Sequence, residues 1–216
     1  MQFSRTPVTL GVAALVVLAG CTGTLAEFSS EPATVPVSAL SAGYVHGNTT
    51  DVTVPIGFGL GPVSRDVRLT GWVSGYSKTT ADDDIALLTV VSTPDAEFEG
   101  QSLSPVVRLS DPELVSWTLD RVADASVRGG IDANVTGLRV VDSETRTVLG
   151  TPTEVVTYTG TVEVDGESVA VLLHLAVVAH EGDVVVALGA HEPGLDEREA
   201  LLTLMERIEH EGRASL

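Results

Sequence analysis

Two adjacent strand-like segments in the second half of the chain constrain the fold more than any other feature of the sequence. In residues 154–164, threonines alternate with apolar or aromatic residues, which is the period of a strand with one face in water. Residues 169–179 are apolar at every position apart from His174, as in a central strand that is covered on both faces. Asp165-Gly166, between these segments, suits the tight turn of a hairpin. The sequence therefore predicts a sheet built around this hairpin.

Other segments with strand character flank the hairpin on both sides. Residues 65–76 alternate apolar and polar side chains, and residues 85–91 form a continuous apolar run. Residues 138–141 and 146–149 precede the hairpin and residues 184–190 come after it, with turn-forming residues between the segments. Consecutive strands separated by short turns favour a mostly antiparallel meander.

Two segments have the spacing of amphipathic helices. Ser110 and Glu113 have the layout of a capping box, with Pro112 in the first turn, so a helix is expected from here to about residue 125. Residues 195–210 place leucine, methionine and isoleucine on one stripe and acids opposite it. Two main helices that flank a mostly antiparallel sheet predict the α+β class, with the architecture of an α/β sandwich.

The first 21 residues have the layout of an export signal. A short polar head with one basic residue, Arg5, precedes an apolar run over residues 8–21, which is shorter than the roughly 20 residues that span a bilayer. The run ends in Leu18-Ala19-Gly20-Cys21, which resembles the lipobox of prokaryotic lipoproteins, where the cysteine thiol carries the lipid. Cys21 is the only cysteine in the chain. We therefore predict a signal peptide at residues 1–20 and lipid attachment at Cys21, an uncleaved signal anchor being the alternative.

The segment after the signal peptide lacks a sustained hydrophobic period. Residues 21–34 are rich in turn-forming and polar residues and are predicted to be a lipid-anchored flexible tether. An extended chain spans at most about 3.3–3.6 Å per residue, so this tether keeps the rest of the protein near the membrane. Residues 35–216 are predicted to form a single domain, because one hydrophobic core can serve a segment of this length.

The composition is strongly acidic. The chain has 30 aspartates and glutamates against 12 lysines and arginines, and its formal net charge is −18. Removing residues 1–20 takes away Arg5 and no acid, so the mature chain carries 11 minus 30, or −19. Such a chain repels itself unless counter-ions are plentiful, so the composition, with Lys78 as the only lysine, predicts a halophilic protein. An ordinary acidic secreted protein is the alternative, and in either case the charge argues against nucleic acid as a partner.

The chain contains two asparagines, and each begins an N-glycosylation sequon. The sequons are Asn48-Thr49-Thr50 and Asn134-Val135-Thr136. Both fall where we expect turns, which an exported domain exposes at its surface. Asn48 and Asn134 are therefore predicted glycosylation sites, an accident of composition being the alternative.

The sequence contains no recognisable catalytic motif. The nearest approach to a nucleophile elbow is residues 71–75, Gly-Trp-Val-Ser-Gly, in which Ser74 stands one place too late. The glycines of residues 55–62 lack the spacing of a phosphate-binding loop, and we expect an ordinary loop there. No His-Glu-x-x-His zinc motif occurs. We therefore predict that the chain is not an enzyme and carries no cofactor.

Two histidines are the nearest candidates for a metal site. If Glu181-Gly182 forms a two-residue turn, residue 174 faces residue 189 across the hairpin, and His191 lies diagonally about 7–8 Å from His174 on the same face. The two side chains could then share an ion. No third ligand is evident in the sequence, so ordinary packing of His174 and His191 is favoured and no metal site is predicted.

The order of these features resembles that of a known group of proteins. The chain has a lipobox, an acidic tether, a strand from Gly71-Trp72 to Tyr76, the motif Val91-Ser92-Thr93-Pro94 and a meander from Gly150 to His191. In these features it is similar to haloarchaeal lipoproteins classed as a domain of unknown function. At the level of fold, the layout resembles PsbP, the photosystem accessory protein, and mycobacterial lipoproteins that share its fold. The resemblance implies no catalytic residue.

The export signal and the surface charge together decide the functional prediction. We predict an extracytoplasmic protein on the outer face of the cell membrane, with the lipid at Cys21 as its contact with the membrane. The favoured role is a binding or assembly module for an envelope protein or a small ligand. A passive envelope component and, after it, a hydrolase are the alternatives.

Overall fold

The structure is a computed structural model. It describes residues 26–40, 43–60, 63–79, 85–98, 101–102, 104, 106, 109–124, 135–164 and 167–212. Cys21, Asn134 and the Asp165-Gly166 turn lie outside these residues. Within the described residues, no helix combines the length and the apolar character that crossing a membrane requires.

The described chain is built mainly from strands. Those of the first half are β1 (Ala26–Ser29), β2 (Ala33–Thr34), β3 (Val45–Leu60), β4 (Val63–Thr79), β5 (Ile85–Pro94), β6 (Glu97–Phe98) and β7 (Gln101–Ser102). Those of the second half are β8 (Val135–Val148), β9 (Thr151–Val164), β10 (Glu167–His180), β11 (Asp183–His191) and β12 (Glu209–His210). The helices of the described chain are η1 (Val37–Ala39), a short 3-10 helix, α2 (Asp111–Asp124) and α3 (Arg198–Glu206).

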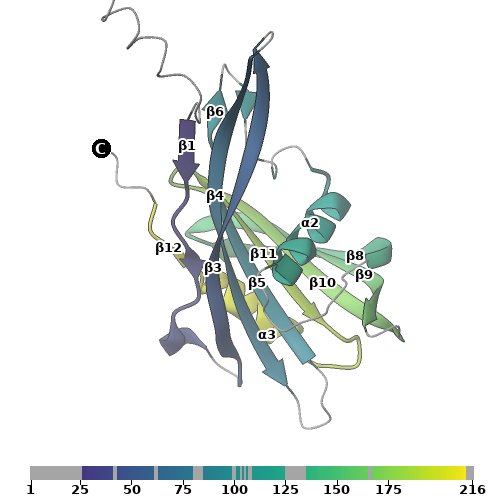
Figure 1. Cartoon of the computed structure of the whole chain (residues 1–216). Helices are drawn as coiled ribbons and strands as arrows, with labels where there is room; N and C mark the ends of the chain where they lie inside the picture. The colour runs from purple at the N-terminus through teal and green to yellow at the C-terminus, as the bar shows by residue number, and fades with distance from the viewer. Residues whose placement is uncertain are drawn as a thin grey trace, which may run out of the picture.

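Eight of the strands form one large mixed sheet (Figure 1). The strands β3-β4-β5-β11-β10-β9-β8 stand in this order across the sheet, each antiparallel to its neighbour. β1 pairs in parallel with residues 67–70 of β4, on the same edge of β4 that β5 occupies along residues 72–79. β2 pairs with β12, and β6 with β7, in separate two-stranded sheets. β3 and β8 are therefore the outer strands of the seven-stranded antiparallel part of the large sheet.

The predicted α/β sandwich is wrong. Strands account for 66% and helices for 15% of the structure, and the large sheet is mixed, not a mainly antiparallel meander between two main helices. One cause is that residues 55–60, expected in a loop, continue β3, because pairing with β4 along the whole hairpin holds them extended. Another is that the final helix, expected over residues 195–210, ends at Glu206, after which the chain pairs with β2 as strand β12.

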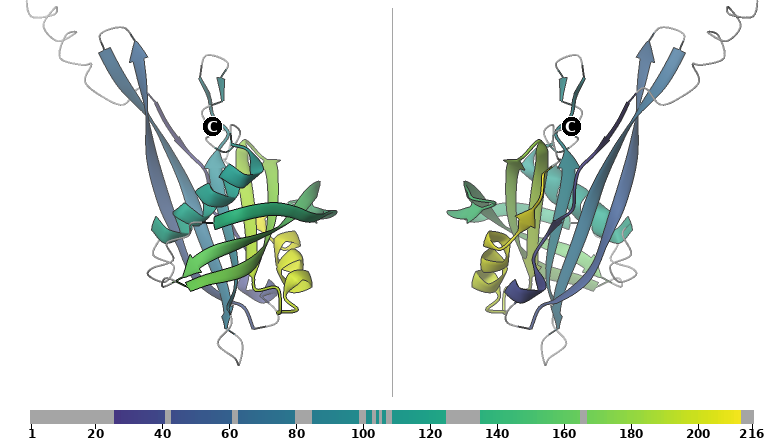
Figure 2. Two further views of the ribbon diagram at one scale, coloured as in Figure 1. Left: turned by 90° about the vertical axis from the view of Figure 1, so that its right-hand side faces the viewer. Right: turned by 90° about the vertical axis from the view of Figure 1, so that its left-hand side faces the viewer.

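Each face of the sheet carries its own apolar cluster. On β11, Val184 and Val186 belong to the cluster that contains Val115 of α2. Val185, between them, belongs to the cluster that contains Leu201 of α3. Because successive side chains of a strand point to opposite faces, α2 and α3 cover opposite faces of the sheet. Both helices are short beside the β3–β4 hairpin, whose outer end extends past them (Figure 2).

Two local predictions are confirmed. The β10–β11 turn is Glu181-Gly182, with φ of 50° and 85°, and it leaves His180 paired with Asp183. At the start of α2, the Ser110 N–H donates to Glu113 Oε2 at 2.8 Å, as a capping box requires. This hydrogen bond and that of the Ser110 hydroxyl favour the ionised carboxylate, so the pKa of Glu113 lies below its ordinary value.

Residues 26–34, which we expected within the tether, take part in the fold. β1 pairs with β4, and β2 pairs with β12. Between them, the Trp72 Nε1–H donates to the Ser30 carbonyl at 2.9 Å, and the Ser92 hydroxyl donates to the Glu31 carbonyl at 2.6 Å. These partners lie 42 and 61 positions further along the chain, so the local sequence carries no signal of the pairing.

Gly71 is expected to be sensitive to substitution. A Cβ at this position of β4 would stand 2.6 Å from the Ser92 carbonyl oxygen, a backbone atom that moves only if β5 moves. We expect Gly71→Ala to lower the free energy of unfolding by about 1–3 kcal/mol, measured by urea denaturation in concentrated salt. Gly194→Ala is the matched control, because an added Cβ there meets no atom within 4 Å. Equal midpoints for the two variants would contradict the close approach.

Candidate functional site

The structure brings together the two histidines that the sequence singled out. His174 on β10 faces Gly189 on β11, as predicted for a two-residue turn, and His191 lies two positions further along β11. His174 Nε2 and His191 Nε2 are 3.1 Å apart, and the two rings stack with their centroids separated by 5.2 Å. Both residues are buried, with exposed fractions of 0% and 3%.

A single backbone carbonyl determines where the protons of this pair lie. His191 Nδ1 is 2.8 Å from the Glu192 carbonyl oxygen, which only accepts, so Nδ1 carries a hydrogen and Nε2 of the neutral ring accepts. His174 Nε2 must then donate to His191 Nε2, which leaves His174 Nδ1 to accept from the Thr157 hydroxyl at 3.0 Å. The four groups form one continuous hydrogen-bond chain in which both rings are neutral.

Burial keeps both rings neutral. It lowers the pKa of His174 to about 4, with a further contribution from the neighbouring His191 ring, and it also lowers the pKa of His191. The positive charge of Arg198 acts in the same direction on both rings and would equally repel a metal cation. In the described residues, no cluster of three or more His, Cys, Asp or Glu is suited to hold a metal ion. The pair is therefore interpreted as part of the packed interior.

The only lysine belongs to a second polar cluster, which is partly buried and which the sequence did not indicate. Lys78 Nζ pairs with Glu197 Oε1, and the Tyr44 hydroxyl donates to Glu197 Oε2 at 3.0 Å. Burial, together with the charge of Glu197, raises the pKa of Tyr44. The contacts hold the segment before α3 against β4 and the residue that precedes β3. Their role is structural, because the polar groups bind one another.

Asn48 lies on the outer strand β3 and not in the turn that we expected. A register shift between His46 and Asn48 marks a β-bulge at Gly47. Asn48 is exposed, and its Nδ2 donates to Thr50 Oγ1 of the same sequon at 2.7 Å. An exposed position on an outer strand is open to a transferase, so glycosylation of Asn48 stays a prediction. The second site, Asn134, precedes the first residue of β8 and lies outside the described residues.

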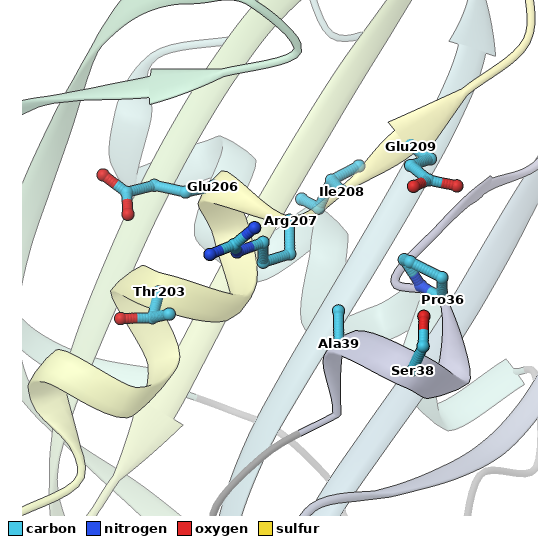
Figure 3. Close-up of a pocket in the computed structure, with 8 residues that line it drawn as sticks. All are labelled: Pro36, Ser38, Ala39, Thr203, Glu206, Arg207, Ile208 and Glu209. Atoms are coloured by element: carbon cyan, nitrogen blue, oxygen red, sulfur yellow. The ribbon is translucent and has the colours of Figure 1, made fainter.

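Two hollows stand out on the described surface, and the larger lies beside the end of α3 (Figure 3). Its volume is about 570 Å³. It is lined by Pro36, Ser38 and Ala39 of the η1 segment and by Thr203, Glu206, Arg207, Ile208 and Glu209 of the α3–β12 segment. Three of these residues are exposed and charged, with both signs present. Such a lining leaves a ligand in contact with water and gives little specificity, so we do not regard this hollow as the functional site.

The smaller hollow is an apolar groove between α2 and β8, which we call the Trp117 groove. Its volume is about 480 Å³. It is lined by Leu109, Pro112, Glu113, Ser116, Trp117, Val135 and Leu138. Val135 and Leu138 belong to the start of β8, and Trp117 stands opposite on α2. The groove therefore brings together a helix and an outer strand that are separate in the sequence.

The polar side chains of the Trp117 groove already have hydrogen-bond partners. The Glu113 carboxylate accepts from the N–H and the hydroxyl of Ser110, at 2.8 and 2.7 Å. The Ser116 hydroxyl donates to the Pro112 carbonyl at 3.2 Å. The surface that can meet a ligand is consequently mainly apolar and aromatic, which suits a lipophilic molecule.

Sequence reasoning could identify only one wall of this groove. Trp117 falls at the edge of the apolar stripe of its helix, a position that favours packing against the fold. It is partly buried there, as that position implies. Nothing in the local pattern of Val135 and Leu138 indicates that they stand opposite Trp117, because this proximity depends on how β8 crosses the sheet.

Comparison with known families places the chain. Residues 32–209 match the family described as Domain of unknown function (DUF6517). The chain belongs to this family. The predicted resemblance to a family of unknown function is thus confirmed at that level, and the match begins within the N-terminal segment that pairs with the rest of the fold.

Two solved structures are similar to this DUF6517 chain over 74% of its length. One is the protein of unknown function PA94 from Pseudomonas aeruginosa, with 10% identity, 99% of that chain covered and a TM-score of 0.37. The other is LpqN of Mycobacterium tuberculosis, described as involved in cell envelope biogenesis, with 14% identity, 85% of that chain covered and a TM-score of 0.29. No curated protein matches the sequence. The assignment to DUF6517 therefore depends on the family match alone.

Proposed function

We propose that this member of DUF6517 is an extracytoplasmic lipoprotein that binds a small apolar ligand in the Trp117 groove. The observation that carries the binding role is the groove itself, an apolar hollow of about 480 Å³ between α2 and β8. The lipobox and its single cysteine support a lipid anchor at Cys21 on the outer face of the cell membrane. The acidic composition supports an environment rich in salt.

The chemistry of the groove favours an uncharged, lipophilic ligand. Removal of apolar surface from water drives such binding, and the Trp117 ring adds a flat aromatic contact. An anionic ligand would meet the net negative charge of the chain and the ionised Glu113. A strongly polar ligand would leave its own groups without partners, because the polar atoms nearby are already hydrogen bonded.

A protein partner from the envelope is the second candidate, and two exposed valines favour it. Val140 and Val141 on the outer strand β8 have exposed fractions of 61% and 54%. The pairing of β8 with β9 shifts register twice near these residues, which makes β8 a poor template for adding another strand. A partner would therefore dock on the valine side chains, next to the groove.

Binding of the neutral dye Nile red tests the ligand role. In a Trp72→Phe background, Trp117 is the only tryptophan, and we expect energy transfer from it to dye bound in the groove. Leu138→Asp places a charge in the groove wall and should weaken dye binding at least about tenfold, which corresponds to about 1.4 kcal/mol. Val177→Asp is the matched control, because Val177 is 38% exposed on β10 and does not line the groove. Unchanged affinity in Leu138→Asp would exclude the groove as the binding site.

The lipid anchor has its own test in the native host. We expect Cys21→Ser to abolish lipid attachment, because the thiol is the attachment atom, so that mature protein no longer enters the detergent phase. Measurement of phase partitioning together with intact mass distinguishes loss of the lipid from loss of export. Processing and partitioning like those of the unmodified chain would refute attachment at Cys21.

A further inference from the structure

We propose that the outer end of the β3–β4 hairpin inserts into the interface of the bilayer that holds the anchored chain. The residues concerned are Ile56, Phe58 and Leu60 of β3 and Val63 of β4, which we call the hairpin end. This inference rests on the proposed lipid anchor and assigns a second membrane contact to the same protein. It also determines the orientation of the domain relative to the membrane.

The hairpin end is a two-stranded ribbon. β5 pairs with residues 72–79 of β4, and β1 pairs with residues 67–70. Before Val67, the described part of β4 pairs with β3 alone, as far as the pair of Leu60 and Val63 (Figure 2). A two-stranded ribbon is at best marginally stable in water, so its outer end calls for a further contact.

The sequence of the hairpin end is apolar and uncharged. Residues 52–64 contain no aspartate, glutamate, lysine, arginine or histidine, although the chain is strongly acidic. Ile56, Phe58 and Leu60 are the large apolar residues in this part of β3, and Val63 follows them on β4. At the base, Ile56 packs on the small cluster that includes Val67 of β4. A strand with this composition is suited to a lipid interface and is unusual on a surface that faces concentrated salt.

The local charge permits contact with an anionic bilayer. Over the paired residues 51–72 the chain has two arginines, Arg65 and Arg68, and two acids, Asp51 and Asp66, so the local net charge is 2 minus 2, or zero. The whole chain carries −18. Anionic headgroups therefore repel most of the molecule but not this hairpin, which favours an orientation with the hairpin toward the membrane.

The parallel pairing of β1 brings the start of the described chain, Ala26, toward this end of the molecule. Ala26, the first residue of β1, pairs with Val67, and β1 and β4 run in the same direction (Figure 1). The N-terminal end of β1 therefore points toward the hairpin end. Cys21 precedes Ala26 by five positions, a separation of at most about 18 Å, whereas Val63 lies about 13 Å along β4 from Val67. A bilayer that holds a lipid at Cys21 is within reach of the hairpin end.

Vesicles of phosphatidylcholine with brominated acyl chains test the insertion, because bromine quenches tryptophan only at close range. The lipidated chain is reconstituted in concentrated salt as Phe58→Trp and, separately, as Val45→Trp. Val45 lies at the opposite end of β3 and is 59% exposed, so it is the matched control. The native Trp72 and Trp117 contribute the same background to both variants. We expect the added tryptophan of Phe58→Trp to be quenched at least about twofold more than that of Val45→Trp.

Flotation of the vesicles separates failure of the anchor from failure of the insertion. If neither variant floats, the anchor and the insertion that rests on it are both refuted. If both float and neither added tryptophan is quenched, the anchor stands and the insertion is refuted. Protection of Phe58→Trp from aqueous acrylamide without quenching by bromine would identify a protein, or a second copy of the chain, as the occupant. Leu60→Trp repeats the measurement if Phe58→Trp does not melt cooperatively.

Discussion

In buffer of low ionic strength, we expect the domain to lose its tertiary structure and to regain it when potassium chloride is raised to molar concentration. The chain carries a formal net charge of −18, and the mutual repulsion of its carboxylates is largely unscreened at about 0.1 M salt, where the Debye length is about 10 Å. At about 1 M the Debye length falls to about 3 Å, so only immediate neighbours still repel one another.

The surface of the structure shows why the arginines do not offset this repulsion. Arg146 is shared among three carboxylates, with Glu144 and Glu199 at 2.9 and 3.0 Å and Glu206 at 3.8 Å. Arg198 pairs with Glu144 at 2.8 Å and also with Asp142. Arg146 and Arg198 are thus each surrounded by more than one anion, and added salt must supply the remaining positive charge.

Circular dichroism melting across a salt series measures this dependence. Sucrose at matched osmolality is the control, because it favours compact states without screening charge. We expect potassium chloride to raise the melting temperature far more than sucrose does. A cooperative transition with the same midpoint at low and at molar salt would show that the acidic surface does not need counter-ions.

A second large effect is expected at the buried pair formed by Asp183 and His210. His210 Nε2 and Asp183 Oδ2 are 3.1 Å apart, and both side chains have an exposed fraction of 0%. The Glu31 backbone N–H also donates to Asp183 Oδ2, at 3.3 Å. The pair therefore joins the start of β11 to β12 and to the N-terminal segment. We expect Asp183→Ala to lower the free energy of unfolding by about 3–5 kcal/mol, because it leaves His210 buried without its partner.

The same pair makes stability depend on pH. The hydrogen bond between His210 and Asp183 is the main reason that the pKa of His210 is raised, and burial opposes it. The charge of Asp183, the Pro32 carbonyl and the charge of Glu181 raise the pKa further. The folded state then keeps a proton that the unfolded state releases near pH 6.5. The stabilisation is fully present below that pH and is lost as pH rises through the folded-state pKa of His210.

His174 and His191 act in the opposite sense. Burial lowers the pKa of both rings, that of His174 to about 4, so below pH 6.5 the unfolded state binds protons that the folded state does not. Their contribution to stability therefore decreases as pH falls from 6.5 toward about 4. The three histidines together favour a maximum of stability near pH 6.5, the ordinary value of the group.

Asp183→Asn isolates the contribution of the ion pair. The amide keeps the shape of the side chain and an oxygen that accepts hydrogen bonds, but it removes the charge that favours the protonated His210 ring. In urea denaturation at constant high salt, we expect the difference in stability between the unmodified chain and Asp183→Asn to shrink as pH rises above 6.5. A difference that stays constant across this range would contradict the assignment of a charged His210 in the folded state.

The parts of the structure that sequence reasoning predicted are those governed by neighbours in the chain. The side chains of Ser110 and Glu113 are three positions apart, so their capping box results from local geometry. The facing of His174 and Gly189 results from the length of one turn and the alternation of a strand. In both cases, the contact depends on the backbone conformation of a few consecutive residues, which the local sequence restricts.

The Trp117 groove and the parallel pairing of β1 could not be predicted in this way. The residues of the groove come from α2 and from β8, and their separation depends on how a helix packs on a sheet. Residues 26–29 form only a short strand whose burial alternates, and nothing within them selects β4 as the partner. Such contacts form because they satisfy backbone groups and cover apolar surface that other elements leave open.

By itself, therefore, the sequence determined the net negative charge, the central hairpin and the register in which His174 meets His191. The tertiary structure alone decided that the sheet is mixed and that Asp183 and His210 meet in the interior. It also decided that β3 and β4 extend through a glycine-rich stretch and end in a two-stranded ribbon. The physical reason is the range of the interactions. Alternation, turns and caps act between residues a few positions apart, whereas strand order and buried pairs depend on residues that are distant in the chain competing for the same partners.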